Sequence, residues 1–156
     1  MPVLYITGPS TGNTLELTEL SVIESYIAHK YGFLSDNSCE DNQILVFNSS
    51  TQALFDKFVT MVIRAPEVLR AQMKEHFILT QIGHWAKYHE RALQVNGANG
   101  LYLGDGKKDK GVTQAELKLA TVSEVMIKLS GDKFISQDKT PAILKVCERV
   151  EAGMHC

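Results

Sequence analysis

Hydrophobic positions divide the chain into a short N-terminal part with strand character and a longer remainder with helical periodicity. Residues 2–6 (PVLYI) are rich in β-branched and aromatic side chains, and residues 14–17 follow them after a turn with glycine and proline. From Thr18 onward, apolar side chains recur at helical spacing until Gly32 offers a left-handed stop. This pattern predicts a β-hairpin followed by a helix.

The remainder predicts long helices only. A three-and-four spacing of apolar residues runs from Ile44 to Val62, and Pro66 ends or kinks that helix. A second long helix fits 68–95. Gly83 lies inside it, where glycine costs about 1 kcal/mol relative to alanine, so we expect a close helix contact there.

Two later helices have clear start signals. Thr113 is an N-cap residue, and Glu116 is placed to reach back to the N–H of Thr113, which together form a capping box. Thr140 is the expected cap of the last helix, with Pro141 at its first position.

Composition excludes several classes of protein. The formal charge of -2 arises from 16 basic and 18 acidic residues, so no positive field favours nucleic acid as a partner. The three cysteines lack C-x-x-C spacing, which favours a reducing, cytoplasmic location over a disulfide framework. No apolar run approaches the roughly 18 residues of a membrane span, so we expect no membrane partner. The histidines show no H-x-x-x-H pair, so we expect no metal site.

Several segments together resemble the glutathione transferase family, particularly its fungal members. They are PVLYI at 2–6, LTELS at 17–21, WAKYHE at 85–90, LYLGD at 101–105, TQAEL at 113–117 and TPAIL at 140–144. The resemblance implies a mainly α (α+β) fold. A partial thioredoxin-like ββα segment (1–34) and a linker (35–42) would precede a glutathione transferase C-terminal-like helical domain (43–156).

The resemblance also implies a degenerate glutathione site. In the family, backbone groups after a cis-proline hold the cysteinyl part of glutathione, and an acid or amide followed by serine holds the γ-glutamyl end. Pro2, Val3 and Glu19 match this pattern, but Leu20 replaces the serine. Ser21 lies one residue on, about 100° round the helix, and is the remaining hydroxyl. We therefore expect glutathione, as the only candidate cofactor, to bind weakly.

The resemblance begins almost at Met1, after the segment that carries the family's catalytic Tyr, Ser or Cys. We therefore expect a chain that is shortened at its N-terminus and also at its C-terminus, without a catalytic residue. The preferred reading is a non-catalytic binding or self-assembly protein. One alternative is an active or residual glutathione transferase or glutathione-binding detoxification protein, and another is a protein-interaction scaffold module of the same fold.

The first strand suggests how such a protein assembles. In the family fold, a strand from the preceding unit flanks it, so here its far side becomes an unpaired edge, formed by Val3, Leu4, Tyr5 and Ile6. We expect a homodimer or larger homo-oligomer that covers this edge. A pocket between the long helices is a second possible site, for a small apolar ligand.

Overall fold

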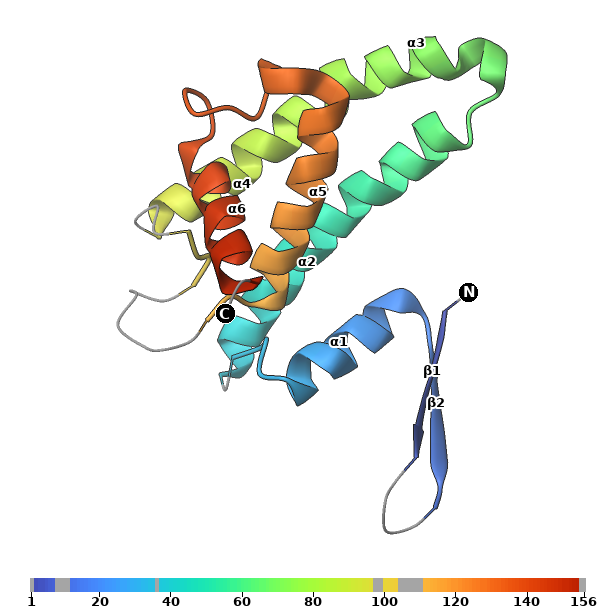
Figure 1. The fold of residues 1–156 in the computed structure, drawn as a ribbon, viewed down its shortest axis with the longest axis vertical. Helices are drawn as coiled ribbons and strands as arrows, with labels where there is room; N and C mark the ends of the chain where they lie inside the picture. The colour runs from blue at the N-terminus through green and yellow to red at the C-terminus, as the bar shows by residue number, and fades with distance from the viewer. Residues whose placement is uncertain (1, 8–11, 36, 97–99, 104–110, 155–156) are drawn as a thin grey trace.

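The computed structural model describes residues 2–7, 12–35, 37–96, 100–103 and 111–154. The fold is mainly α, with one two-stranded sheet at the N-terminus, as the sequence predicts (Figure 1). The elements are β1 (Val3–Thr7), β2 (Thr14–Thr18), α1 (Leu20–Lys30), α2 (Ser38–Phe58), η1 (Val59–Ile63), α3 (Glu67–Phe77), η2 (Ile78–Ile82), α4 (Gly83–Val95), α5 (Gln114–Ser130), η3 (Gly131–Lys133) and α6 (Pro141–Met154). η1 and η2 are π-helical turns, and η3 is a 3₁₀ turn.

β1 and β2 form an antiparallel hairpin whose register places Val3 opposite Thr18 and Thr7 opposite Thr14. Both strands lie within one residue of their predicted positions. The hairpin stands away from the helices, and α1 lies between it and the rest of the molecule (Figure 1). Little of the rest of the protein therefore covers the strands.

α1 ends in the way that Gly32 predicts. Gly32 has a φ of 76°, and the N–H of Phe33 donates to the carbonyl of Ala28 at 2.8 Å. The N–H of Gly32 donates to the carbonyl of His29 at 3.5 Å, which completes a Schellman motif. The turn sends the chain from α1 toward α2.

α2 begins earlier than the apolar spacing predicts. Its first residue is Ser38, inside the polar stretch 35–42 that we read as a linker. The side chain of Asn37 accepts a hydrogen bond from the N–H of Cys39 at 2.9 Å, and the first turn is acidic, so capping and the helix dipole extend the helix into polar sequence. The division into domains at these residues stays a prediction.

The predicted helix over 68–95 is present as α3 and α4, joined without a break by the π-turn η2. Gly83 is in close contact, but with a different partner from the one expected. A Cβ at Gly83 would lie 3.0 Å from the ring of Phe134, which follows α5 and is not part of a helix. The absence of a Cβ at Gly83 therefore leaves room for the Phe134 ring to pack against the helix.

α5 is the central helix, and it packs against both α2 and α6 (Figure 1). The core around it includes side chains that are fully buried, among them Phe77, Ile82, Leu93, Leu119, Met126 and Ile143. Among the described residues, no helix combines the length and the apolar character needed to cross a bilayer.

Buried carboxylates hold the N-termini of α5 and α6. At α5, the N–H of Thr113 donates to Glu116 at 2.8 Å and the Thr113 hydroxyl accepts from Ala115, so the capping box is present. Glu116 also accepts the N–H of Tyr102 at 2.7 Å. Glu116 therefore links the backbone of the segment before α5 to the first turn of that helix through hydrogen bonds.

At α6, Pro141 is the first residue of the helix, as the sequence predicts, so Thr140 takes the N-cap position, but the first N–H groups of the helix bond to a different side chain. The N–H groups of Ala142 and Ile143 donate to Glu90 of α4 at 3.1 and 3.0 Å. The Thr140 hydroxyl instead accepts from the N–H of Ser136 at 3.1 Å. The buried Glu90 carboxylate is favoured over the Thr140 hydroxyl as the acceptor because it binds two helix N–H groups and its charge complements the helix dipole.

Candidate functional site

The residues that the resemblance assigns to glutathione gather where the hairpin leads into α1. Because Val3 pairs with Thr18, Pro2 and Val3 lie beside the turn that carries Glu19. Ser21 follows, exposed, in the first turn of α1. The hairpin register therefore brings Pro2, Val3 and Glu19 to one end of the sheet, with Ser21 on the adjacent helix.

Glu19 has an unusual backbone. Its φ of 69° and ψ of 124° make it the one non-glycine residue with positive φ in the described part of the chain. Such a conformation costs about 1–3 kcal/mol and is often found at binding sites. Glu19 is also the N-cap of α1, yet no side chain caps this helix and its first turn has no acidic residue. The start of α1 therefore offers free N–H groups and a positive dipole end to an anionic group.

The first helical position carries no hydroxyl. Leu20 is 46% exposed, and its side chain lines a groove beside α1. Ser21 is the next residue on the exposed surface. The Met1–Pro2 peptide bond, where the resemblance predicts a cis-proline, involves a residue outside the described part of the chain.

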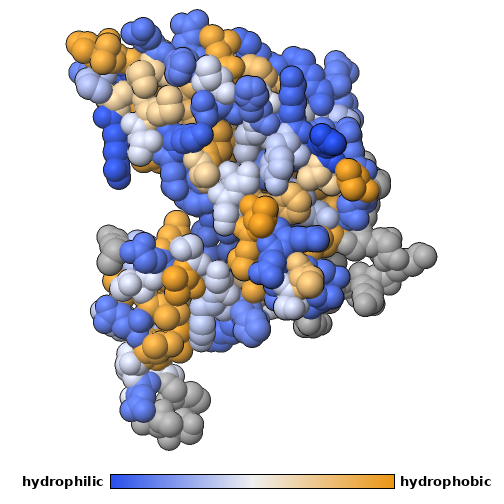
Figure 2. Space-filling view, turned by 180° about the vertical axis from the view of Figure 1, so that it is seen from behind, coloured by the Kyte–Doolittle hydropathy of each residue, from blue (hydrophilic) through white to orange (hydrophobic). Residues whose placement is uncertain are grey.

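The groove, here called the α1 groove, has a volume of about 450 Å³ and lies between α1, α2 and α5. Its apolar walls include Leu20, Ile27, Phe33, Phe55, Leu117 and Val122. In Figure 2, hydrophobic residues gather over the hairpin and α1 in the lower lobe, and a hollow separates this lobe from the helices above. A cavity of this size and character is typical of sites for small organic molecules.

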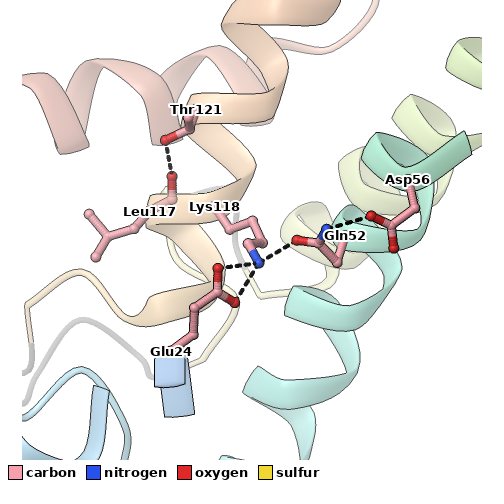
Figure 3. A network of polar contacts seen from close by, with 6 residues as sticks. All are labelled: Glu24, Gln52, Asp56, Leu117, Lys118 and Thr121. Carbon is pink, nitrogen blue, oxygen red and sulfur yellow. Dashed lines mark hydrogen bonds and ion pairs between the residues drawn. The ribbon is translucent and has the colours of Figure 1, made fainter. Parts of the chain in front are cut away.

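A polar network borders the α1 groove (Figure 3). The Lys118 ammonium donates to both carboxylate oxygens of Glu24, at 2.8 and 2.6 Å, and to Oε1 of Gln52 at 2.7 Å. The Gln52 amide nitrogen in turn donates to Asp56 at 2.7 Å. All three N–H groups of Lys118 are therefore used, and the network joins α5 to α1 and α2.

Gln114 lines the same groove and lacks side-chain partners. It is 7% exposed, and neither its amide oxygen nor its amide nitrogen has a hydrogen-bond partner in the structure. Its backbone N–H is satisfied, because it donates to the carbonyl of Phe33 at 3.0 Å. An unsatisfied buried polar group costs about 1–3 kcal/mol, so this side chain needs an explanation.

One histidine, His89, lies in the helical core. His89 is fully buried, and its ring contacts the Tyr102 hydroxyl and lies 3.4 Å from that of Thr51. Burial lowers the pKa of His89 to about 3, which keeps the ring neutral. Within the described residues, no three histidine, cysteine or acidic side chains are grouped closely enough to hold a metal ion.

Two of the three cysteines lie among the described residues. Cys39 is exposed in the first turn of α2. Cys147 is partly buried, and burial, with the nearby charge of Glu151, raises its pKa to about 11. A raised pKa disfavours the reactive thiolate. Cys156 lies outside the described residues.

Sequence reasoning missed the polar residues of the α1 groove. Lys118 and Glu24 are 94 positions apart, and Lys118 and Gln52 are 66 apart. No motif links them, and each reads as an ordinary surface residue of its own helix. Gln114 is a polar residue beside the capping threonine, and this position was the one sequence signal for a groove residue. The burial of its side chain, however, depends on how α1 packs against α5.

Comparison with known protein families finds no matching family, and no curated protein matches the sequence. Solved structures do match. The Onchocerca volvulus pi-class glutathione S-transferase superposes with a TM-score of 0.72 at 23% identity, over 90% of this chain and 62% of the other. The Fasciola hepatica sigma-class glutathione S-transferase gives 0.73 at 18% identity, over 95% and 66%.

Prostaglandin synthase D of Nilaparvata lugens gives a TM-score of 0.71 at 15% identity, over 99% of this chain and 73% of the other. The chain spans less than two thirds of the length of the two glutathione S-transferase structures. The resemblance to fungal members in particular stays a prediction. The similarity extends over almost the whole chain, and it shows that the protein has a glutathione transferase-like fold.

Proposed function

We propose that this glutathione transferase-like protein is a non-catalytic binding protein that self-associates through β1. The observation that supports this proposal most directly is the exposed, uncharged edge of a hairpin that projects from the helices (Figure 1). Two-stranded hairpins are marginally stable in water, so a partner that covers the strands stabilises them. The arrangement of cysteines favours a reducing, cytoplasmic setting.

β1 is better suited than β2 to pair with another chain. β1 reads VLYIT and carries no charge, with Val3 42% and Tyr5 63% exposed. β2 reads TLELT and carries Glu16, which opposes Tyr5 in the register. A charge on an edge strand discourages pairing, so β1 is the edge that a second copy extends.

Apolar surface continues from the hairpin onto α1. Leu15 is 54% exposed on β2, and Val22 is 47% exposed on α1. Figure 2 shows hydrophobic residues gathered over the lobe that the hairpin and α1 form. Contiguous apolar patches of this kind are typical of protein interaction sites.

Light scattering coupled to size exclusion tests the proposal. The protein should elute as a dimer or larger species at micromolar concentration, because pairing buries the β1 edge. Tyr5→Lys should shift it toward a 17.3 kDa monomer. Glu16→Lys is the matched control, since it places the same side chain at the paired position on β2 and should leave the assembly intact. A wild-type monomer, or equal effects of the two lysines, would contradict the proposal.

Glutathione binding is a second candidate function, supported by the strained backbone of Glu19 beside the uncapped start of α1. Pro2 and Val3 would face the cysteinyl part of the tripeptide, and Glu19 with Ser21 the γ-glutamyl end. Calorimetry with glutathione should give weak binding, and Leu20→Ser should tighten it roughly tenfold to a hundredfold by restoring a hydrogen bond to a charged group. Binding that Leu20→Ser does not change would place glutathione elsewhere.

The enzyme alternative has its own test. Turnover of glutathione with chlorodinitrobenzene should stay near background in the pure protein, because Leu20 in place of the family's serine weakens the binding of glutathione and the raised pKa of Cys147 disfavours a thiolate. Robust turnover would replace the proposed function with an active transferase.

A further inference from the structure

The α1 groove is a cavity that the proposed assembly does not use. Its lining comes from α1, α2, α5 and Phe33, and no residue of β1 or β2 contributes to it. Pairing through β1 therefore needs no residue of this groove. Its volume of about 450 Å³ falls within the range of about 300–1,000 Å³ typical of ligand sites.

The walls of the groove favour an apolar ligand body. Ile27 and Leu20 come from α1, Phe55 from α2, and Leu117 and Val122 from α5. Leu20 and Ile27 remain 46% and 40% exposed in the absence of a ligand. Covering these side chains would remove apolar surface from water, which is the main source of affinity in such sites.

The polar network disfavours an anionic ligand. Lys118 is the cation of the groove, and Glu24 and Gln52 already accept all of its hydrogen bonds. Asp56 adds a further negative charge through Gln52. A carboxylate or sulfonate would have to displace Glu24 from Lys118 beside a surplus of negative charge, whereas a neutral ligand leaves the network intact.

Gln114 supplies the polar recognition group. Its amide is buried against the groove with an unused donor and an unused acceptor. A carboxamide has the complementary acceptor and donor, so a small movement of Gln114 into the groove would let the two amides pair. Such pairing would satisfy two groups that the protein alone leaves without partners.

We propose that the α1 groove binds a neutral small molecule with an aromatic or aliphatic body and one amide-type group, which pairs with Gln114. The site differs from the candidate glutathione site in position and in charge preference. It lies on the groove side of α1, whereas the glutathione residues lie at the hairpin end, and it rejects the carboxylates that glutathione carries.

A matched pair of probes tests the charge preference. 1-Naphthaleneacetamide and 1-naphthaleneacetate share one aromatic body and differ in the amide or carboxylate group. Titration of the full chain, followed by NMR chemical shifts of α5 amides, should show Kd for the amide at least roughly tenfold lower than for the acetate, the size of effect expected from one good polar interaction. Equal affinities, or no binding of the amide, would overturn the proposal.

Two variants test the location. Gln114→Leu should weaken the amide roughly tenfold and leave the acetate unchanged, because it removes the pairing group and keeps an apolar wall. Leu117→Trp should abolish binding of the amide by filling the groove. Gln72→Leu, at an exposed position on α3, is the matched control and should bind as wild type does.

Wild-type chemical shifts away from the substituted positions establish that each variant is folded. If Gln114→Leu is folded and binds the amide as tightly as Gln72→Leu does, Gln114 is not the recognition group and the proposal fails. Binding that survives Leu117→Trp places the probe outside the groove, which likewise overturns it.

Discussion

The helical part and the N-terminal ββα unit of this protein differ in how completely each satisfies its own groups. In the helical part, Glu90 and Glu116 are buried and each accepts backbone N–H groups at a helix start. In the N-terminal unit, α1 has no side-chain cap and the hairpin exposes Tyr5 and Leu15.

The difference shows that a region can form its predicted secondary structure without having a hydrophobic core of its own to stabilise it. Both regions form the elements that their sequences predict, but only the helical part surrounds a core of its own. Stabilisation of the N-terminal unit therefore depends on contacts outside it. These contacts are with the helices behind α1, with another copy along β1 or with a ligand in the α1 groove. The unpaired strand edge, the uncapped start of α1 and the α1 groove therefore all lie at the end of the molecule where we propose that it functions.

Truncation of one aromatic residue in each region should give the largest contrast. Phe77 is fully buried, and Phe77→Ala should lower the free energy of unfolding by about 3–5 kcal/mol through a cavity in the core. Tyr5 is 63% exposed, and Tyr5→Ala should change it by less than about 0.5 kcal/mol in the monomer. Urea denaturation at low protein concentration measures both. Similar losses would show that the two regions share one core.

A pH titration should sharpen the comparison through His89. Its pKa is about 3 in the folded protein against an ordinary 6.5, so below pH 6.5 the unfolded chain binds a proton that the folded core does not. Stability is therefore full above this pH and falls on acidification toward pH 3, with a contribution of up to about 1.4 kcal/mol per pH unit.

Denaturation of wild type and His89→Gln between pH 7 and 4.5 measures this contribution. The difference in unfolding free energy between the two proteins should change by about 2 kcal/mol across that window. His84→Gln, at an exposed position on the same helix, is the control and should follow wild type. A His89→Gln curve parallel to wild type would mean that the ring is not held neutral.

Removal of the α5 cap should give a smaller effect confined to the helical part. Thr113→Ala should cost about 0.5–2 kcal/mol because it removes an N-cap hydroxyl. Thr121→Ala is a useful control, since that exposed hydroxyl donates within α5 to the carbonyl of Leu117. An unchanged denaturation midpoint in Thr113→Ala would show that the capping box carries no stability.

Local signals predicted most of the fold. The hairpin, the stop at Gly32 and the box at Thr113 each depend on residues a few positions apart. The start of α6 at Pro141 was predicted, but the carboxylate that accepts its first N–H groups was missed because it belongs to Glu90, about fifty positions earlier in the chain. Likewise, the π-turn η2 and the ring of Phe134 against Gly83 depend on how helices pack rather than on local pattern.

The candidate site was less predictable for the same reason. Resemblance placed Pro2, Val3, Glu19 and Ser21 in order along the chain, but the backbone of Glu19 follows from no local rule for glutamate. The α1 groove is created only when α1 packs beside α2 and α5. Gln114, the proposed recognition residue of the groove, therefore cannot be identified from the sequence, because its role depends on the burial of its side chain in the fold.

Hydrogen exchange measured at several protein concentrations tests the central claim, that the N-terminal hairpin is stabilised by association while the helical part is stable alone. Amides of β1 and β2 should exchange quickly at nanomolar concentration and become protected at micromolar concentration, whereas amides of α5 should stay protected throughout. Tyr5→Lys should abolish the concentration dependence and Glu16→Lys should retain it. If the hairpin of a monomeric protein is as protected as α5 at every concentration, the claim is contradicted.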